Sequence, residues 1–342
     1  MFATPEALDP PRARACHLRK AAPAPHARGA GTTAARSELW LPRPALAACV
    51  RGVMARDTRG ASLAAAQRYN HFPAAPTCAL LWYLSGECDL LHPPLPASEP
   101  AVPRRLPAIS LCGPFTRPTV SWNPGDMHAF MVLLMPDALQ LMTGLDIGAL
   151  VDRVVPADQA LDASWRALLE PVRTACDDEE RVARLEAFLL PRWRQARPPG
   201  VWGSFRLADW SQSLAVRAAR SALGRSLRQA ERRIKRWTGQ TQRRLQGLQR
   251  SEQAFLHVAA TRWAQPPDWA DVAVHTGYAD QAHLCRETRR VTGFAPEALR
   301  RQMFTEESLW AYRLWALGVD EDWESPPSAP PPRKQHVPHP GP

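Results

Sequence analysis

The sequence of 342 residues lacks any run of about 18 apolar residues, the length that a membrane-spanning helix requires. Its seven cysteines are odd in number and scattered, without a Cys-x-x-Cys pair or a histidine pair at zinc-site spacing. This cysteine usage suits a reducing cytoplasm. We therefore expect a cytoplasmic protein with no membrane span, no metal site and no cofactor.

Acidic residues are scarce at the amino terminus, where the first 36 residues are rich in Ala, Pro and Arg. No apolar signal core follows them. Residues 1–36 are therefore interpreted as a disordered leader, or as an upstream extension from a misassigned start codon. The other end of the chain has little that could form a core, because residues 325–342 contain eight prolines. We expect a disordered Pro-rich tail there.

The excess positive charge lies in one segment. Residues 203–304 contain 18 Lys and Arg against 8 Asp and Glu, whereas the rest of the chain contains 25 of each sign. A basic segment beside a neutral one is typical of a polyanion binder, because Lys and Arg release the counterions condensed on phosphates. An Arg-rich surface that serves solubility alone is the alternative, and charge by itself does not separate the two.

Residues 39–134 are interrupted every few positions by Pro or Gly, with short apolar runs in between. Such runs predict buried strands, here at 78–84, 109–112 and 129–135, with a further strand within 116–125. Ser85-Gly86 predicts a hairpin turn. The first half of the chain is thus expected to be a small β-sandwich or barrel.

Helical periodicity begins after Pro136 and predicts helices at 161–175 and 179–196. Pro198-Pro199-Gly200 then breaks the chain, so we place a linker at 198–202. The expected class is α+β. A β-rich, cupin-like sensory or effector domain with trailing helices would occupy residues 37–197, and an all-α DNA-binding domain would occupy residues 203–304.

The basic segment repeats itself at an offset of 54 residues. Arg232 aligns with Arg286, and Thr238-Gly239 aligns with Thr292-Gly293. Each copy predicts a short helix, a tight turn at 223–224 or 277–278, and a second, basic helix of about 12 residues. This order of elements is the helix-turn-helix pattern.

Local signals mark the ends of the two basic helices. Ser226 and Asp280 occupy equivalent positions of the repeat, and both residue types are good helix N-caps. Gly239 and Gly293 follow the last helical positions, where glycine commonly closes a helix. The helix expected at 245–263 would join the two units.

The second unit carries a specific signature in residues 273–296, which contain Gly277-Tyr278-Ala279-Asp280-Gln281-Ala282-His283-Leu284. This stretch resembles the Gly-Tyr-x-Asp-Gln-x-His-Phe-x-Arg pattern of bacterial AraC/XylS-type transcription regulators. The resemblance is close over residues 210–301 and extends upstream only as a general layout. It implies a sequence-specific regulator that binds double-stranded DNA and a small-molecule effector of unknown identity, with RNA polymerase as a candidate partner. It leaves the oligomeric state open.

The chain departs from the family pattern at three packing positions. Thr288 stands where the family usually has Phe, Thr241-Gln242 stand where it has Ser-Pro, and Ala230 replaces a common Leu. Because these positions pack rather than read bases, the departures bear on the stability of the helix pairs more than on DNA binding.

The resemblance implies that both basic helices lie in major grooves, with residues near their amino ends facing base edges. Arg can bond bidentately to guanine, Gln to adenine, Glu can accept from cytosine, and Ala can contact a thymine methyl group. We predict DNA contacts by Arg228, Gln229, Glu231, Arg232 and Arg236 in the first unit, and by Gln281, Ala282, His283, Cys285, Arg286 and Arg290 in the second. Of these, Arg236 and Arg290 are interpreted as phosphate contacts or a solvated face.

The amino-terminal part offers fewer signals. Trp82, Tyr83, Arg117 and Trp122 are candidates for lining an effector pocket, with strand core as the competing interpretation. His71, Cys88, His92, Cys112, Asp126 and His128 are metal-binding residue types without recognisable ligand spacing, so structural roles are favoured. The alternative function is a DNA-targeted enzyme with a metal-dependent amino-terminal domain.

Overall fold

The computed structural model describes residues 19–21, 34–91, 103–201, 204, 206–220, 226–260 and 266–317. Its strands are β1 (Arg19–Ala21), β2 (Arg36–Trp40), β3 (Val50–Asp57), β4 (Tyr69–Phe72), β5 (Cys78–Ser85), β6 (Asp89–Leu90), β7 (Arg104–Arg105), β8 (Ile109–Cys112), β9 (Thr119–Trp122), β10 (His128–Leu134) and β11 (Val154–Pro156).

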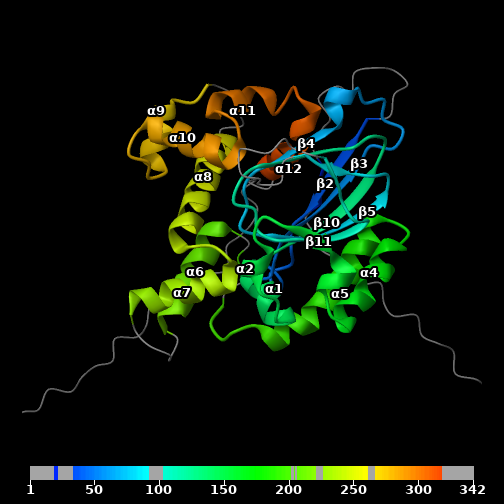
Figure 1. Ribbon diagram of the computed structural model, residues 1–342. Coiled ribbons are helices and arrows are strands. Elements are labelled where there is room, and N and C mark those ends of the chain that lie inside the picture. Colours follow the sequence, from blue (N-terminus) through cyan, green and yellow to red (C-terminus); the bar gives the residue numbers. More distant parts are fainter. Residues whose placement is uncertain are drawn as a thin grey trace, which may run out of the picture.

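Its α-helices are α1 (Pro136–Thr143), α2 (Ile147–Leu150), α3 (Ala157–Ala160), α4 (Ala163–Arg173), α5 (Asp178–Ala196), α6 (Leu207–Arg220), α7 (Leu227–Thr238), α8 (Gln242–Ala260), α9 (Trp269–His275), α10 (Gln281–Thr292), α11 (Pro296–Gln302) and α12 (Trp310–Leu317). The short 3₁₀ helices are η1 (Ala65–Arg68) and η2 (Glu307–Leu309). Antiparallel sheets therefore precede a helical carboxyl-terminal region, as the predicted α+β class requires (Figure 1).

The described strands form a larger sheet in the order β1-β2-β3-β10-β5-β8-β11 and a smaller one in the order β4-β9-β6-β7. The central strand β10 is apolar on both sides because both of its faces are covered. Phe130 and Val132 pack in one cluster with Trp82 and the helices α4 and α5, whereas Met131 packs in a second cluster with Trp310 of α12. Such two-sided burial explains why the sequence of β10 is a continuous apolar run.

The strands predicted at 78–84, 109–112 and 129–135 are confirmed as β5, β8 and β10. The hairpin predicted at Ser85-Gly86 is wrong, since β6 pairs with β7 and β9 in the smaller sheet and not with β5. Gly86 has a φ of +77°, and a Cβ atom there would lie 2.3 Å from the carbonyl oxygen of Asp126. The turn therefore sends the chain close past the start of β10 and into the other sheet.

Part of the predicted leader is ordered as a strand. β1 pairs antiparallel with β2, with Arg19 opposite Trp40. This pairing satisfies backbone groups that β2 would otherwise present at a sheet edge. The expectation of disorder is thus corrected for β1, while the other residues before 34 and the tail at 325–342 lie outside the described residues.

The hydrophobic core continues across the linker predicted at 198–202. Trp210 of α6 and Ile234 of α7 belong to the same buried cluster as Phe130 of the larger sheet. Asp137 of α1 supplies the polar part of this contact, because it accepts a hydrogen bond from Trp210 Nε1 at 2.8 Å and pairs with Arg217 at 2.9 Å. The first basic helix pair is therefore docked on the helices of the amino-terminal part.

A substitution of Gly239, at the end of α7, tests the docking of the first basic helix pair on α2. Its φ is +70°, and a Cβ atom there would lie 2.5 Å from Val151 Cγ2 and 3.0 Å from the carbonyl oxygen of Ile147. We expect Gly239→Ala to lower the free energy of unfolding by about 2–4 kcal/mol, because steric displacement of α2 adds to left-handed strain. Urea denaturation of the full chain measures the change.

Gly144→Ala is the matched control. Gly144 ends α1 with a φ of +73°, but nothing lies within 4 Å of the added Cβ position. Only left-handed strain of about 1 kcal/mol is expected there. Equal losses for the two variants would contradict a tight contact between α7 and α2.

Candidate nucleic-acid interface and central cavity

The first helix-turn-helix-like unit consists of α6 and α7. Ser226 Oγ accepts a hydrogen bond from the backbone N–H of Gln229 at 3.3 Å, and Gln229 Oε1 accepts one from the backbone N–H of Ser226 at 3.4 Å. This capping box satisfies backbone donors at the start of α7. The turn residues 221–225 lie outside the described residues.

The second unit consists of α9 and α10. The Asp280 carboxylate accepts from the backbone N–H of His283 at 2.6 Å, and Gly293 ends α10 with a φ of +82°. Tyr278, in the turn, is buried, and its N–H donates to the carbonyl oxygen of Ala273 at 2.9 Å. The N-caps and closing glycines predicted from the 54-residue repeat are confirmed in both units.

Most of the predicted DNA-contacting side chains are exposed. On α7 these are Arg228, Glu231, Arg232 and Arg236, and on α10 they are Gln281, Ala282 and Arg286. The half-buried members of the predicted set are Gln229, His283, Cys285 and Arg290. The amino-terminal part of each basic helix therefore presents hydrogen-bonding side chains to solvent while its opposite side packs.

Two of the predicted contacts have partners within the protein. Arg290 donates to Glu287 Oε2 through Nε at 3.0 Å and Nη2 at 2.8 Å, and its guanidinium lies against Gly247 of α8. The hydrogen bond to Arg290 is the largest influence on Glu287 and lowers the pKa of its carboxyl. The Gln229 side chain is engaged in the capping box. Both residues thus have a structural role, which the sequence pattern did not distinguish from a DNA-contacting role.

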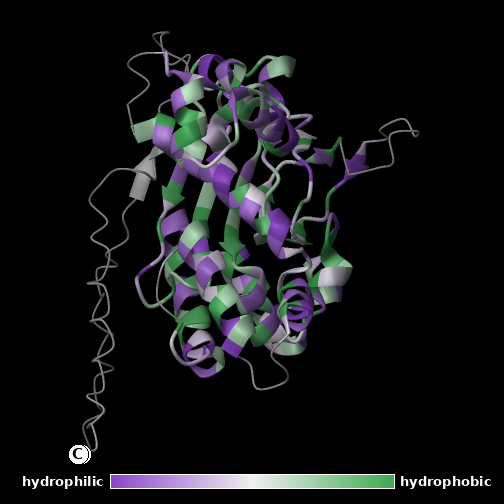
Figure 2. Ribbon diagram, turned by 90° about the vertical axis from the view of Figure 1, so that its left-hand side faces the viewer, coloured by the Kyte–Doolittle hydropathy of each residue, from purple (hydrophilic) through white to green (hydrophobic). Residues whose placement is uncertain are grey.

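The two units lie at opposite ends of α8 on the same side of the molecule (Figure 1). Figure 2 looks onto that side, with hydrophilic residues on the helices at both its top and its bottom. At 1.5 Å per residue, the 19 residues of α8 span about 28 Å. The second basic helix, α10, packs along α8, with Leu284 beside Ala254 and Val258 and with Val291 beside Leu248.

The chain after the second unit returns to the sheets. We call η2 together with α12 the carboxyl-terminal strap. Glu307 pairs with Arg56 of β3 at 2.6 Å and with Arg313 at 3.2 Å, and all three side chains are at most 5% exposed. Burial lowers the pKa of Arg313 to about 10, against the opposing attraction of Glu307. Trp310 Nε1 donates to Asn70 Oδ1 at 2.8 Å.

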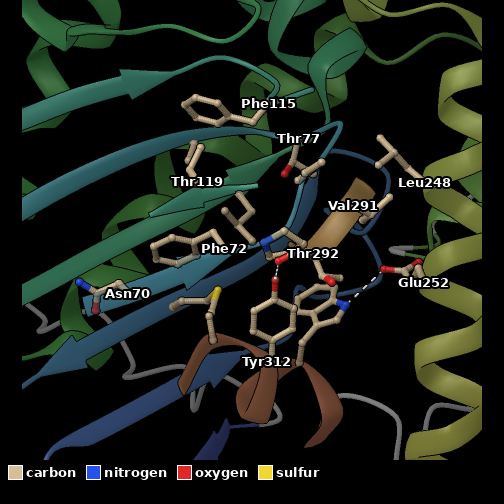
Figure 3. Close-up of a pocket in the computed structure, with 18 of the residues that line it drawn as sticks. Asn70, Phe72, Thr77, Phe115, Thr119, Leu248, Glu252, Val291, Thr292 and Tyr312 are labelled. Carbon is tan, nitrogen blue, oxygen red and sulfur yellow. Dashed lines mark hydrogen bonds between the residues drawn. The ribbon is translucent and has the colours of Figure 1, made fainter. Parts of the chain in front are cut away.

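A second buried ion pair joins β3 to α8. Arg51 pairs with Glu252, and the Arg51 guanidinium lies 4.5 Å from the ring centroid of Trp315. Trp315 Nε1 also donates to Glu252 Oε1 at 3.2 Å (Figure 3). The strap, the larger sheet and the helix between the two units therefore meet in one polar contact.

A cavity of about 290 Å³ lies between these elements, and we call it the central cavity. Figure 3 shows its walls, which come from the sheets, α8, α10 and the strap. Representative lining residues are Met54, Leu81, Met131, Leu248, Val291 and Tyr312. The lining is mostly aliphatic and aromatic, and it also contains polar side chains such as Asn70, Ser121 and Ser251.

Of the four residues predicted to line an effector pocket, Tyr83 lies at the central cavity. Trp82 is fully buried on the other face of the sheet and donates through Nε1 to the carbonyl oxygen of Leu169 at 3.0 Å. Arg117 is exposed and Trp122 is half-buried, and neither belongs to the cavity wall. The sequence pattern missed the walls from α8, α10 and the strap, because nothing local signals that these elements fold back onto the sheet.

The metal-binding residue types do not converge within the described residues, where no group of three or more His, Cys, Asp or Glu could hold an ion. His128 instead pairs with Asp178 at 3.0 Å in the core, and the His71 ring contacts Phe294 at 5.4 Å. Burial raises the pKa of the Cys88 and Cys112 thiols. His92 lies outside the described residues. Within the described ranges, every helix is too short or too polar to span a lipid bilayer.

Comparison with known proteins gives a distant structural similarity. No family model and no curated protein sequence matches the chain. ToxT from Vibrio cholerae bound to (E)-4-(8-methylnaphthalen-1-yl)but-3-enoic acid is similar with a TM-score of 0.34 and 11% identity, over 69% of this chain and 96% of the ToxT chain. A ToxT structure with bound unsaturated fatty acid has a TM-score of 0.30 and 11% identity, over 68% and 91% of the two chains. Similarity at this level assigns neither a family nor a ligand.

A substitution of Glu307 tests whether its buried carboxylate holds the strap on the sheet. Glu307→Gln leaves the guanidinium groups of Arg56 and Arg313 buried without a charge partner, so we expect a loss of about 3–5 kcal/mol in the free energy of unfolding. Urea denaturation of the full chain is the measurement.

Glu297→Gln is the matched control, because the Glu297 carboxylate pairs with Arg300 and Arg301 on the surface of α11. A partly exposed carboxylate of this kind contributes about 1 kcal/mol or less. Similar losses for the two variants would show that the buried group does not hold the strap.

Proposed function

We propose that this protein is a sequence-specific DNA-binding transcription regulator of the AraC type, controlled through its amino-terminal part. The observation that carries the proposal is the pair of capped basic helices, α7 and α10, which repeat at 54 residues and stand at the two ends of α8. The signature at 277–286 supports the same conclusion from the sequence.

The exposed residues suit base readout in two different ways. Arg228 and Arg232 on α7 can each donate two hydrogen bonds to guanine, and Glu231 between them can accept from cytosine. On α10, Gln281 suits adenine and Arg286 suits guanine. Because the two faces differ, each unit would prefer its own sequence, and the full site would have no inverted symmetry.

The rival function, a DNA-targeted enzyme with a metal-dependent domain, has no observation of its own in the described residues. A regulator needs only that the amino-terminal part influence the two units. The structure offers a route for such influence, since α7 packs against α2 and α10 forms a wall of the central cavity. An effector bound in the amino-terminal part would act through these contacts.

Base readout can be tested at one arginine in each unit. Arg232→Ala and Arg286→Ala should each weaken binding at the preferred site by about 1–3 kcal/mol, because each loses a bidentate base contact. Each variant should relax sequence preference at its own half of the site only. Titration of a randomised DNA pool with the full chain, followed by sequencing of the bound fraction, measures both effects.

Arg173→Ala is the charge-matched control for this experiment. Arg173 is exposed on α4, in the amino-terminal part, and pairs with Glu170. Its removal should leave DNA affinity and preference unchanged. A uniform loss at all sequences for Arg232→Ala and Arg286→Ala would mean that these arginines hold phosphates and read no bases.

The geometry of the site makes a separate prediction. A single full-length chain should protect two DNA segments about one helical turn apart, roughly 10 base pairs, because two groove-reading units stand on one chain. Hydroxyl-radical footprinting of a selected site measures this, and Arg286→Ala should weaken only one of the two segments. One protected segment, or a requirement for an inverted repeat bound by dimers, would contradict the assignment of both units.

A further inference from the structure

A loop of the amino-terminal part, residues 113–118 between β8 and β9, lies against both helix-turn-helix-like units. The carbonyl oxygen of Thr116 accepts a hydrogen bond at 3.0 Å from Nη2 of Arg244, in the first turn of α8. A Cβ atom added at Gly293, which ends α10, would lie 3.7 Å from Pro118 Cγ. Arg117 stands between these two contacts, so the loop places its side chain between the units.

Three arginines gather at this loop, and we call Arg117, Arg244 and Arg290 the arginine cluster. The Nη2 atom of Arg290 lies 3.2 Å from the Cβ position of Gly247, about one turn along α8 from Arg244. Burial lowers the pKa of Arg244, and the nearby positive charges of Arg290 and Arg117 lower it further, against the attraction of Asp152. The three guanidinium groups are therefore close enough to repel one another.

The two carboxylates beside the cluster are engaged elsewhere. Glu287 pairs with Arg290 at 2.8 Å. Asp152 accepts hydrogen bonds from the backbone N–H of Thr116 at 2.5 Å and from its hydroxyl group at 2.6 Å, so this carboxylate holds the loop in place. Two carboxylates thus stand against three guanidinium groups, and the cluster keeps a net positive charge.

Two of the arginines retain unused donors. Within the described residues, Arg117 has no ion-pair partner, and the one hydrogen bond of the Arg244 side chain is the bond to Thr116. The Nε atom of Arg244 is buried and has no hydrogen-bond partner. A buried donor without a partner and several like charges together are unfavourable. An anion at this place would satisfy the donor and relieve the repulsion.

A phosphate of the DNA backbone has the chemistry and the accessibility that the cluster requires. A guanidinium group can donate two parallel hydrogen bonds to the oxygens of one phosphate. The cluster is open to such a group from solvent, because Arg117 is exposed and the Arg290 side chain is 36% exposed. If α7 and α10 face two segments of one duplex, the backbone between those segments passes the space between the two helices, where Arg117 lies.

We infer that the arginine cluster binds backbone phosphates between the two DNA segments that α7 and α10 face, so that the amino-terminal part contacts DNA directly. This inference rests on the proposed function and extends it beyond the basic segment, residues 203–304. Contacts of this kind position a protein on the duplex without reading its sequence. A movement of the loop at 113–118 would therefore change DNA affinity and leave sequence preference as it is.

The first test removes one charge at a time from the full chain. Arg117→Gln and Arg244→Gln should each weaken binding roughly three- to tenfold at low salt, and by a similar factor at preferred and random sequences. The slope of log affinity against log salt should become less steep by about one in each variant, because one phosphate contact is lost. Since Arg117 is exposed, its variant folds even where Arg244→Gln does not.

Arg166→Gln is the matched control for charge. Arg166 is exposed on α4 and, like Arg117, has no ion-pair partner among the described residues. Figure 1 shows α4 on the opposite side of the molecule from α7 and α10. Its substitution lowers the net charge of the chain by the same amount and should leave both the affinity and the salt slope unchanged.

The second test locates the phosphate. Single phosphates of a selected site are replaced by neutral methylphosphonates, and each modified duplex is titrated with the native chain and with Arg117→Gln. At one or two phosphates between the two protected segments, the modification should weaken the native chain and have little further effect on the variant. Such non-additivity is the sign of a direct contact between the two groups that were removed.

Native-like affinity and salt slope in folded Arg117→Gln would overturn the inference and leave the regulator standing. The same conclusion would follow if every methylphosphonate weakened the native chain and the variant equally, or if Arg166→Gln lost as much affinity as Arg117→Gln. A native chain that binds no DNA at any salt concentration would refute the regulator and this contact together.

Discussion

The buried carboxylate of Glu307, held between Arg56 and Arg313, determines how the carboxyl-terminal part of the chain meets the sheets. A buried ion pair adds little net stability, since both partners lose their hydration. The ion pair instead determines the position at which the strap docks on the sheet. Any other docking of the strap would leave a guanidinium or a carboxylate in the core without a counter-charge, which is strongly unfavourable. The strap can therefore dock on the larger sheet in only one register. The hydrogen bond from Trp310 to Asn70 of β4 holds the strap in the same position.

This constraint reaches the proposed DNA-binding helices through α8, which is held at its start and in its middle. At one end, α7 packs on α2, and the Asp137 carboxylate binds Trp210 and Arg217 of α6. Further along α8, Glu252 pairs with Arg51 of β3, and beside Leu248 the backbone N–H of Ala74 donates to the carbonyl oxygen of Val291 at 2.7 Å. The distance between α7 and α10 is thus set by the amino-terminal part as well as by the length of α8. A change in that part can alter the spacing without any change in the helices that face DNA.

Local signals predicted the elements well, and contacts between distant residues were beyond them. Ser226, Asp280, Gly239 and Gly293 act within one helical turn, so their capping roles followed from the sequence. The pairing of Arg290 with Glu287 is also local. A spacing of three residues on a helix is typical of such ion pairs, so the sequence does contain a signal for it. Trp310 and Asn70 are 240 positions apart, and no periodicity reports such a contact. The cavity walls were missed for the same reason.

Polar and apolar residues play different roles in the contact between the sheets and the carboxyl-terminal helices. The pairs Arg56–Glu307 and Arg51–Glu252 fix the register of this contact. The apolar residues around the central cavity add hydrophobic and dispersion energy to the same contact. Since α10 forms part of the cavity wall, the strength of that contact determines how firmly one of the two proposed DNA-reading helices is held.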